Sequence, residues 1–340
     1  GDHRTLPPAG TLLTGARMVL AAGEQGSPSW ALRFRDLQAP ALLAGVAMHT
    51  VSRLPSLVAA GTAIFLGALA HAGSGWPIIR GGSGSITAAL AADLSSHGGE
   101  IITGHRVSEL RELPPSRTYL FDTTPATALG VIGDRVGPGL RRALAGFRHG
   151  NGVTKIDFVL SGPVPWTDPE VGRAGTVHLG GTRADLVRAE AEVAAGRHPE
   201  HPVCLLSDPS VVDEGRAHGG LRPLWAYTHV PAGSPLDLTA QVTAEIERYA
   251  PGFADLVVAS GCIPAARMSE HNQNYVDGDF TAGAMTAWQM IARPTLRRDP
   301  YRLAPGIYLC SSSTPPGPGV HGMCGLHAAR RLLRDVFASG

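Results

Sequence analysis

The stretch that most constrains the fold is Gly306–Asp335, which reads GIYLCSSSTPPGPGVHGMCGLHAARRLLRD. Ile307–Cys310 is an apolar run of strand length, a turn-rich segment follows it, and a helix-forming run rich in Ala, Leu and Arg comes last. A strand that leads through a glycine loop into a helix presents backbone N–H groups at the positive end of that helix. This unit therefore predicts a binding site for an anion or for the electron-rich edge of a ring.

Three glycines of this loop, Gly317, Gly319 and Gly322, satisfy the pattern G-x-G-x-x-G. The dinucleotide fingerprint that the pattern usually marks also requires a second strand and an acidic residue about 20 residues further on. Only 18 residues follow Gly322, and they contain no strand-like run. The loop is therefore expected to close a nucleotide-binding fold that begins elsewhere.

The composition excludes several classes of protein. Hydrophobic residues make up 44% of the 340 residues and charged residues 17%, which is enough to bury a core in about two domains. The net charge is +1, so electrostatics gives no reason to expect a nucleic-acid partner. The four cysteines are scattered and the 14 histidines form no H-x-x-x-H or H-E-x-x-H pattern, so we expect neither a metal site nor a disulfide framework. A cytoplasmic location fits this use of cysteine.

One segment raises the question of a membrane. Leu54–Ile79 contains no Asp, Glu, Lys or Arg and is roughly long enough to span a bilayer. Pro55, His71 and several glycines make it a poor span, so the favoured interpretation is a buried helix of a substrate domain. A membrane protein is the alternative, and peripheral contact with a membrane is a weaker form of it.

The chain shows two different sequence textures. Residues 1–72 predict helices broken at prolines, and residues 76–125 predict alternating glycine loops, helix and strand. The elements expected in the second stretch are a helix over Ser85–Ser96, a turn at His97–Gly99, a strand over Glu100–Val107 and a short strand over Thr118–Asp122.

Residues 150–290 predict an antiparallel sheet with helices on one side, because short strand-like runs are separated by long mixed connections. The expected strands are Val153–Leu160, Thr176–Leu179, Val203–Ser207 and Leu224–Val230, and the expected helices are Ala184–Ala195 and Leu238–Tyr249.

Several blocks, in this order along the chain, resemble the phytoene desaturase-type flavoproteins, in particular the bacterial NAD(P)/FAD-dependent oxidoreductases related to pyridine nucleotide-disulfide oxidoreductase domain-containing protein 2. The blocks are GGSGSITAALAADLSSHGGEIITGHRVSEL, LWAYTHVPAGSPLD, IERYAPGF, HNQNYVDGDFTAG and YLCSSSTPPGPGVHGMCGLHAARRLL. The resemblance runs from about Trp30 to the C-terminus. The family's N-terminal βαβ unit, with its own G-x-G-x-x-G and ribose-binding acid, has no counterpart here. We therefore expect this sequence to be the C-terminal portion of a larger flavoprotein.

The resemblance implies an α/β plus α+β fold, in which an incomplete FAD/NAD(P)-binding Rossmann-like layer carries an inserted antiparallel-sheet-and-helix substrate domain. The implied cofactor is FAD. The expected parts are residues 1–75 (helical part of the substrate domain), 76–149 (middle segment of the FAD-binding domain), 150–295 (substrate domain) and 296–340 (C-terminal segment of the FAD-binding domain).

The resemblance also implies cofactor contacts. The backbone of Val107 would pair with the adenine edge, and Asp122–Pro125 would pass near the adenosine and pyrophosphate. In the 311–323 loop, glycines let the backbone approach the flavin without a Cβ, and the N–H groups of the following helix would stabilise negative charge at the flavin N1–C2=O edge. The residues assigned to the flavin are Ser312, Ser313, Thr314, Gly319, Val320, Gly322 and Met323. A plain strand or glycine turn is the structural alternative for each.

Lys155 is the only lysine beside 28 arginines, which suggests a position that needs a compact ammonium group. Period-two alternation places Lys155 and Asp157 together on one face of their strand. In related amine oxidase-type flavoproteins a lysine of the substrate domain holds a water at the flavin N5, and the resemblance extends this role to Lys155. The alternative is a solvent-facing ion pair. His321, expected nearest the flavin, and His229, expected to line a substrate cavity, are the other catalytic candidates, with hydrogen-bonded packing as their alternative.

The resemblance thus implies a FAD-dependent oxidoreductase of the dehydrogenase or desaturase type, which would remove a hydride from a C–H bond of a hydrophobic small molecule. A nicotinamide-only dehydrogenase would need a complete βαβ fingerprint, which this sequence does not contain. The main alternative is a non-catalytic interaction or regulatory protein on a truncated flavoprotein scaffold.

Overall fold

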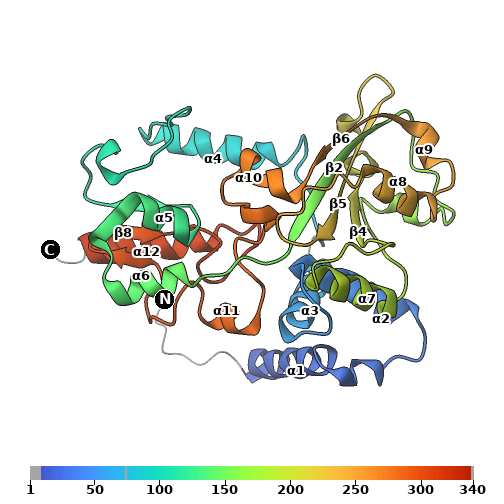
Figure 1. Ribbon diagram of the computed structural model, residues 1–340, viewed down its shortest axis with the longest axis horizontal. Coiled ribbons are helices and arrows are strands. Elements are labelled where there is room, and N and C mark those ends of the chain that lie inside the picture. Colours follow the sequence, from blue (N-terminus) through green and yellow to red (C-terminus); the bar gives the residue numbers. More distant parts are fainter. Residues whose placement is uncertain (1–8, 73–74, 338–340) are drawn as a thin grey trace.

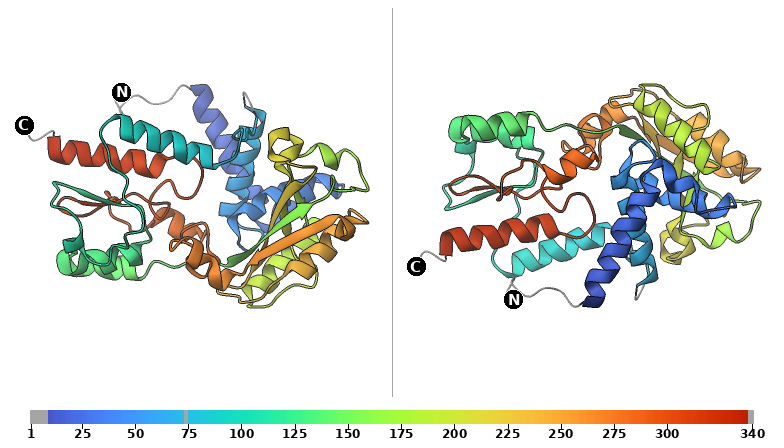
Figure 2. Two further views of the ribbon diagram at one scale, coloured as in Figure 1. Left: turned by 90° about the horizontal axis from the view of Figure 1, so that it is seen from above. Right: turned by 90° about the horizontal axis from the view of Figure 1, so that it is seen from below.

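The computed structural model describes residues 9–72 and 75–337, which form two lobes joined by crossing segments (Figure 1). One lobe contains a three-stranded sheet and the C-terminal helix. The other contains a five-stranded sheet and the N-terminal helices. Seen from above and below, the chain passes between the lobes several times (Figure 2). This is the predicted combination of an α/β layer with an antiparallel-sheet unit.

The small sheet has the strand order β1–β8–β7, with β1 (Tyr119–Phe121), β8 (Ile307–Leu309) and β7 (Arg302–Ala304). β1 and β8 pair in parallel although they lie far apart in the sequence, whereas β7 pairs antiparallel to β8. The helices that follow β1 and β8 are α5 (Pro125–Ile132), α6 (Pro138–Ala145) and α12 (Met323–Phe337). Residues such as Phe121, Ile132 and Leu309 form the core between the sheet and α5 and α6.

The large sheet has the order β3–β4–β5–β2–β6, and all neighbouring strands are antiparallel. Its strands are β2 (Gly152–Leu160), β3 (Thr176–Leu179), β4 (Cys204–Ser207), β5 (Arg222–Val230) and β6 (Val257–Ile263). β2 alternates as predicted, because Ile156, Phe158 and Leu160 are buried while Lys155 and Asp157 are not. β6 was not among the predicted strands.

Helices cover both faces of this sheet, so the prediction of helices on one side is wrong. α8 (Thr239–Glu247) and α9 (Phe253–Leu256) pack on the face of Ile156 and Phe158. α7 (Arg183–Ala194) lies against the other face, where its Glu190 contacts His229 of β5. A capping box between Thr182 and Asp185 starts α7, which explains why this helix was readable from the sequence.

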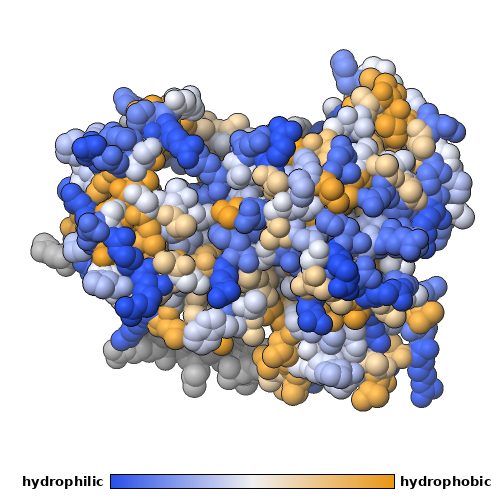
Figure 3. Space-filling view, viewed as in Figure 1, coloured by the Kyte–Doolittle hydropathy of each residue, from blue (hydrophilic) through white to orange (hydrophobic). Residues whose placement is uncertain are grey.

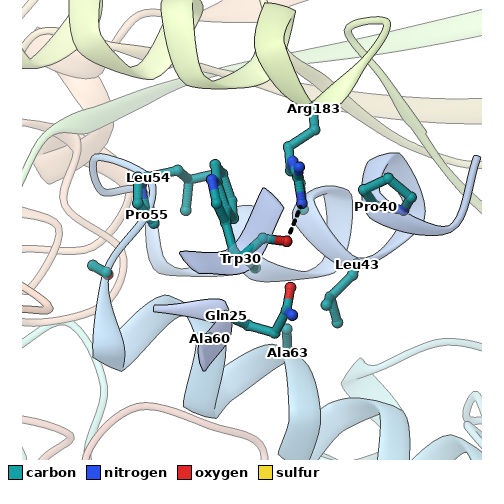
Figure 4. A pocket seen from close by; sticks show the side chains of 12 residues that line it. Gln25, Trp30, Pro40, Leu43, Leu54, Pro55, Ala60, Ala63 and Arg183 are labelled. Atoms are coloured by element: carbon teal, nitrogen blue, oxygen red, sulfur yellow. Dashed lines mark hydrogen bonds between the residues drawn. The ribbon is translucent and has the colours of Figure 1, made fainter. Parts of the chain in front are cut away.

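The N-terminal helices are α1 (Ala9–Gln25), α2 (Gln38–Ala47) and α3 (Leu57–His71). α2 and α3 share a core with α7, and α1 packs on α3. Figure 4 shows the junction, where Arg183 of α7 stacks over the Trp30 ring and donates a hydrogen bond to the Trp30 carbonyl. α3 buries one face, through small residues such as Ala59 and Ala63, so the expectation of a buried helix holds for that face only. Among the described residues no helix is long and apolar enough to cross a membrane.

The predicted helix over Ser85–Ser96 is present as α4 (Gly84–Ser96), but the strand expected over Glu100–Val107 is wrong. That segment pairs with no strand in the described part of the chain, and Ile101 and Ile102 are largely exposed. The apolar pattern was read correctly, but a strand forms only where a neighbouring backbone supplies hydrogen-bond partners. The same lack of neighbours leaves α4 without a buried residue.

Candidate functional site

The candidate site lies at the carboxyl ends of β1 and β8. Because these strands are parallel, the turn at residues 122–124 and the glycine loop at residues 311–322 leave the sheet at the same edge. Each leads into a helix N-terminus, that of α5 or that of α12. In open α/β sheets, ligands bind in the crevice outside the carboxyl ends of the strands. The position of the two loops therefore makes this edge the candidate binding site.

The first half of the glycine loop is buried and internally bonded. Ser313 donates its hydroxyl to the Ala282 carbonyl at 2.9 Å, and Thr314 donates its hydroxyl to the Ser311 carbonyl at 2.7 Å. These hydroxyls therefore hold the loop in shape. Ser312 is half-buried, and its hydroxyl has no hydrogen-bond partner within the described residues. Of the three predicted hydroxyl donors, Ser312 is the one left available to a ligand.

The second half of the loop is exposed. Gly319 and Gly322 both have positive φ, and a Cβ on Gly319 would lie 2.7 Å from the His321 ring. His321 accepts a hydrogen bond through Nδ1 from the Met323 backbone at 3.0 Å, and so caps the start of α12. Val320 projects outward with 95% of its surface exposed. The loop thus offers an open backbone next to a capped helix N-terminus.

A second segment, residues 279–283, braces this loop from the side of the large sheet. Asp279 is buried and accepts hydrogen bonds from the backbone N–H groups of Gly150, Thr281 and Gly283. Burial alone would raise the Asp279 pKa, but hydrogen bonds from His149 and Thr281 outweigh it and the pKa is lowered. The carboxylate therefore stays charged and fixes the turn, in which Ala282 has the unusual φ of 52°.

Arg293 ties the two segments together. Its side chain is 1% exposed, and it donates to the carbonyls of Ser312 at 2.9 Å and Thr281 at 2.9 Å. It also reaches the carbonyls of Ala282 and Gly283. Burial lowers the Arg293 pKa to about 10, partly opposed by the charge of Asp279. The guanidinium is therefore a cation at neutral pH, placed directly behind the glycine loop.

The turn at the end of β1 is braced in the same way. Asn274 donates its amide N–H to the Asp122 carbonyl and accepts a hydrogen bond from the Thr124 backbone. Thr124 then caps α5 by accepting from the Thr127 backbone. Burial raises the pKa of the Asp122 carboxyl. Residues 274–283 thus contact both loops at this sheet edge.

Aromatic side chains of β5 lie on one face of the large sheet, here called the aromatic face, and they contact the segment 279–283. Phe280 lies 5.4 Å, between ring centroids, from Tyr227, and Tyr227 stacks between Trp225 and His229 on β5. Lys155 is the direct cross-strand neighbour of Tyr227. Lys155 is half-exposed and its ammonium group bonds both carboxylate oxygens of Asp157. Residues 279–283 therefore contact the predicted loop through Ala282, and the cross-strand neighbour of the predicted lysine through Phe280.

His229 belongs to a buried cluster that was not foreseen from the sequence. Its Nδ1 is hydrogen-bonded to Glu190, whose side chain is fully buried. Nearby, His49 and His178 contact each other through Nε2 at 3.2 Å. Burial, with a smaller effect from the neighbouring histidines, lowers the pKa of both His49 and His178 to about 4. In the described chain no group of three or more His, Cys, Asp or Glu side chains is arranged to hold a metal.

Some of the residues that meet here were predicted from the sequence and others were missed. Val107 lies in a loop and packs against the core of the small sheet. The braces Asp279 and Arg293 were missed, although the block HNQNYVDGDFTAG contains one of them. An Asp followed two residues later by Thr and four residues later by Gly is a signal for a side-chain-capped turn, and it could have pointed to Asp279.

Comparison of the sequence with known proteins identifies curated relatives. No family model matches the sequence. The chain is 26% identical over 310 residues to pyridine nucleotide-disulfide oxidoreductase domain-containing protein 2 of Rattus norvegicus, covering 80% of this chain and 53% of that protein. It thus spans about half the length of the curated relatives that it matches.

Two solved structures share the arrangement at low sequence identity. An oxidoreductase from Methanosarcina mazei has a TM-score of 0.59 and 13% identity, over 96% of this chain and 73% of that one. A triple mutant of putrescine oxidase has a TM-score of 0.55 and 14% identity, over 99% and 77%. The chain is therefore similar in sequence to pyridine nucleotide-disulfide oxidoreductase domain-containing protein 2 and shares the fold of these two oxidoreductases, for which the phytoene desaturase-type resemblance was a coarse match.

Proposed function

We propose that this chain, a homologue of pyridine nucleotide-disulfide oxidoreductase domain-containing protein 2, carries the flavin-ring half of a FAD-dependent oxidoreductase. The observation that carries the proposal is the sheet edge at which β1 and β8 end. There, two loops enter helices side by side, and the loop before α12 is held in shape by Arg293. The exposed backbone at Gly319–Gly322 suits a flat ring with an electron-rich edge.

Bound there, FAD would accept a hydride or its equivalent from a substrate C–H bond. The protein's part is to place the reactants and to stabilise charge. The first N–H groups of α12 and the buried cation of Arg293 make the loop electropositive, which favours negative charge on the neighbouring ring edge. Val107 and Asp122–Pro125 would face the adenosine part.

We assign the substrate to the aromatic face of the large sheet. Tyr227, Trp225 and Phe280 offer an apolar wall, which supports a hydrophobic small molecule as substrate. Lys155 would hold a water between that wall and the cofactor, with Asp157 fixing its ammonium group. His229 lies beneath Tyr227 and would keep that ring in position. The free cysteines are compatible with a cytoplasmic protein.

We further propose that additional parallel strands complete the nucleotide site along β1. This strand is at the edge of its sheet, and Leu120 is exposed there. Ile101, Ile102 and the outer side chains of α4 are exposed as well. Such apolar edges in a folded protein are normally covered. A βαβ unit on β1 would cover this edge and give the segment 100–107 the neighbours that it lacks.

The test is the FAD content of the protein expressed from its complete gene. We expect close to one FAD per chain, and at least a tenfold loss of FAD in Gly319→Leu, because the new side chain meets His321 and the backbone has a φ that suits only glycine. Gly139→Leu is the matched control, since Gly139 has open space around it in α6. Equal FAD content in both variants would place the cofactor elsewhere.

A non-catalytic role on the same scaffold is the alternative proposal. It predicts a protein that is colourless when purified, or whose bound flavin is not reduced by apolar amines or alkenes in the absence of oxygen. Flavin reduction followed at its visible absorbance band separates the two functions, because a merely structural flavin gives no substrate-dependent bleaching.

A further inference from the structure

The N-terminal helices present an apolar edge that no described part of the chain covers. Aliphatic side chains project there from α1, from the connection to α2 and from α2 itself, and each is between 55% and 84% exposed. These residues, here called the aliphatic edge, are Leu13, Val19, Leu20, Leu32, Leu37 and Leu42. Figure 3 shows orange side chains along the lower rim, where α1 and the connection to α2 lie in Figure 1. Six such residues within thirty positions exceed the scatter of single exposed leucines that soluble proteins tolerate.

Positive charge accompanies this edge. Residues 13–42, which carry the edge, contain three arginines and two acidic residues, Glu24 and Asp36. Glu24 is paired with Arg33, so its charge is already neutralised. Arg17, Arg35 and Arg53 have no carboxylate partner among residues 9–72 and 75–337. On α1, Arg17 lies four residues after Leu13 and three before Leu20, so the charge and the aliphatic groups share one helix face.

We propose that the aliphatic edge docks on the surface of a bilayer that contains anionic lipid. Leucine and valine side chains that protrude separately can each enter the acyl region, while arginines beside them meet the lipid phosphates. A protein partner is the less favoured occupant, because the aliphatic edge consists of Leu and Val, which are under-represented among interface hot spots. The inference does not depend on the oxidoreductase activity.

Vesicle flotation tests it directly. The chain is mixed with vesicles of pure phosphatidylcholine, or of phosphatidylcholine with about one third phosphatidylglycerol, and the bound fraction is measured. We expect binding to the anionic vesicles that weakens with added salt. Leu20→Glu/Leu32→Glu should lower that binding at least tenfold, since each leucine loses its apolar contact with the acyl region and gains a charge that anionic lipid repels. Arg17→Gln/Arg35→Gln should lower it by about fivefold per charge on the anionic vesicles only.

The control is Val212→Glu/Val258→Glu, which adds the same charges at two valines outside the edge that are 57% and 58% exposed. Each variant is first checked for native folding by its thermal transition. Absence of binding to either vesicle would overturn the proposal, and so would equal binding by the Leu20→Glu/Leu32→Glu protein and the control. A concentration-dependent dimer in light scattering that Leu20→Glu/Leu32→Glu abolishes, without vesicle binding, would assign the edge to a second copy instead.

Discussion

Replacing Arg293 by Met should loosen the glycine loop without unfolding the large sheet. The guanidinium satisfies four carbonyls, two of which have other donors: Ala282 accepts from Ser313, and Gly283 accepts from Thr281. The carbonyls of Thr281 and Ser312 would lose the guanidinium donor and stay buried. A buried group left unsatisfied costs about 1–3 kcal/mol, so the two together cost about 3 kcal/mol.

Amide hydrogen exchange measures this loss of local stability segment by segment. About 3 kcal/mol corresponds to roughly a hundredfold faster exchange, and it should appear in residues 279–283 and 311–318 while β2 and β5 keep their protection. Arg293→Lys keeps the charge but reaches fewer carbonyls, so its effect should be intermediate. Arg298→Met, at an exposed arginine, is the control. Unchanged exchange of both segments in Arg293→Met would refute the idea that this side chain organises the loop.

Three further predictions concern the buried histidines, Lys155 and the retention of FAD. Burial lowers the pKa of His49 and of His178 from 6.5 to about 4, so folding disfavours their protonation. The free energy of unfolding should therefore be highest above pH 6.5 and fall toward pH 4, by up to about 3 kcal/mol per histidine. Urea midpoints at pH 7, 5.5 and 4.5 should show a shallower fall in His49→Leu, and parallel slopes for both proteins would contradict the assignment. Lys155→Met and Lys155→Arg should each slow substrate-driven flavin reduction about 10²–10⁴-fold at unchanged FAD content, measured by rapid mixing, and normal rates in both would return Lys155 to a surface ion pair. The 340-residue chain alone should lose FAD on gel filtration that the protein from the complete gene retains, and stoichiometric retention by the chain alone would show that the site needs no further strands.

The elements that could be predicted from the sequence are those whose pattern repeats locally. β2 is legible because Ile156 and Phe158 alternate with polar neighbours, and α12 because a glycine loop precedes it. The strand expected over Glu100–Val107 failed for the opposite reason, since its side-chain pattern says nothing about which backbone lies beside it. Ile101 and Ile102 have the residue types of a strand, but the described part of the chain offers them no strand to join.

The braces of the site were illegible because each depends on contacts between distant residues. Asp279 bonds the backbone of Gly150, and Asn274 bonds that of Thr124, across more than a hundred residues in both cases. Glu190 looks like an ordinary surface residue of α7 until β5 brings His229 against it. A buried charge is recognised by its partner, and a single sequence does not show which residue that partner is.

These long contacts also connect the glycine loop with the large sheet. The exposed part of the glycine loop makes few contacts of its own, so its shape depends on Ser312 and Ser313, which are held by Arg293 and Ala282. Residues 279–283 are in turn fixed at the other end through Asp279 to Gly150, just before β2 begins. The same turn meets the aromatic face through Phe280, whose ring contacts Tyr227. Under the proposed function, residues 279–283 would connect the substrate face of the large sheet with the loop that holds the cofactor.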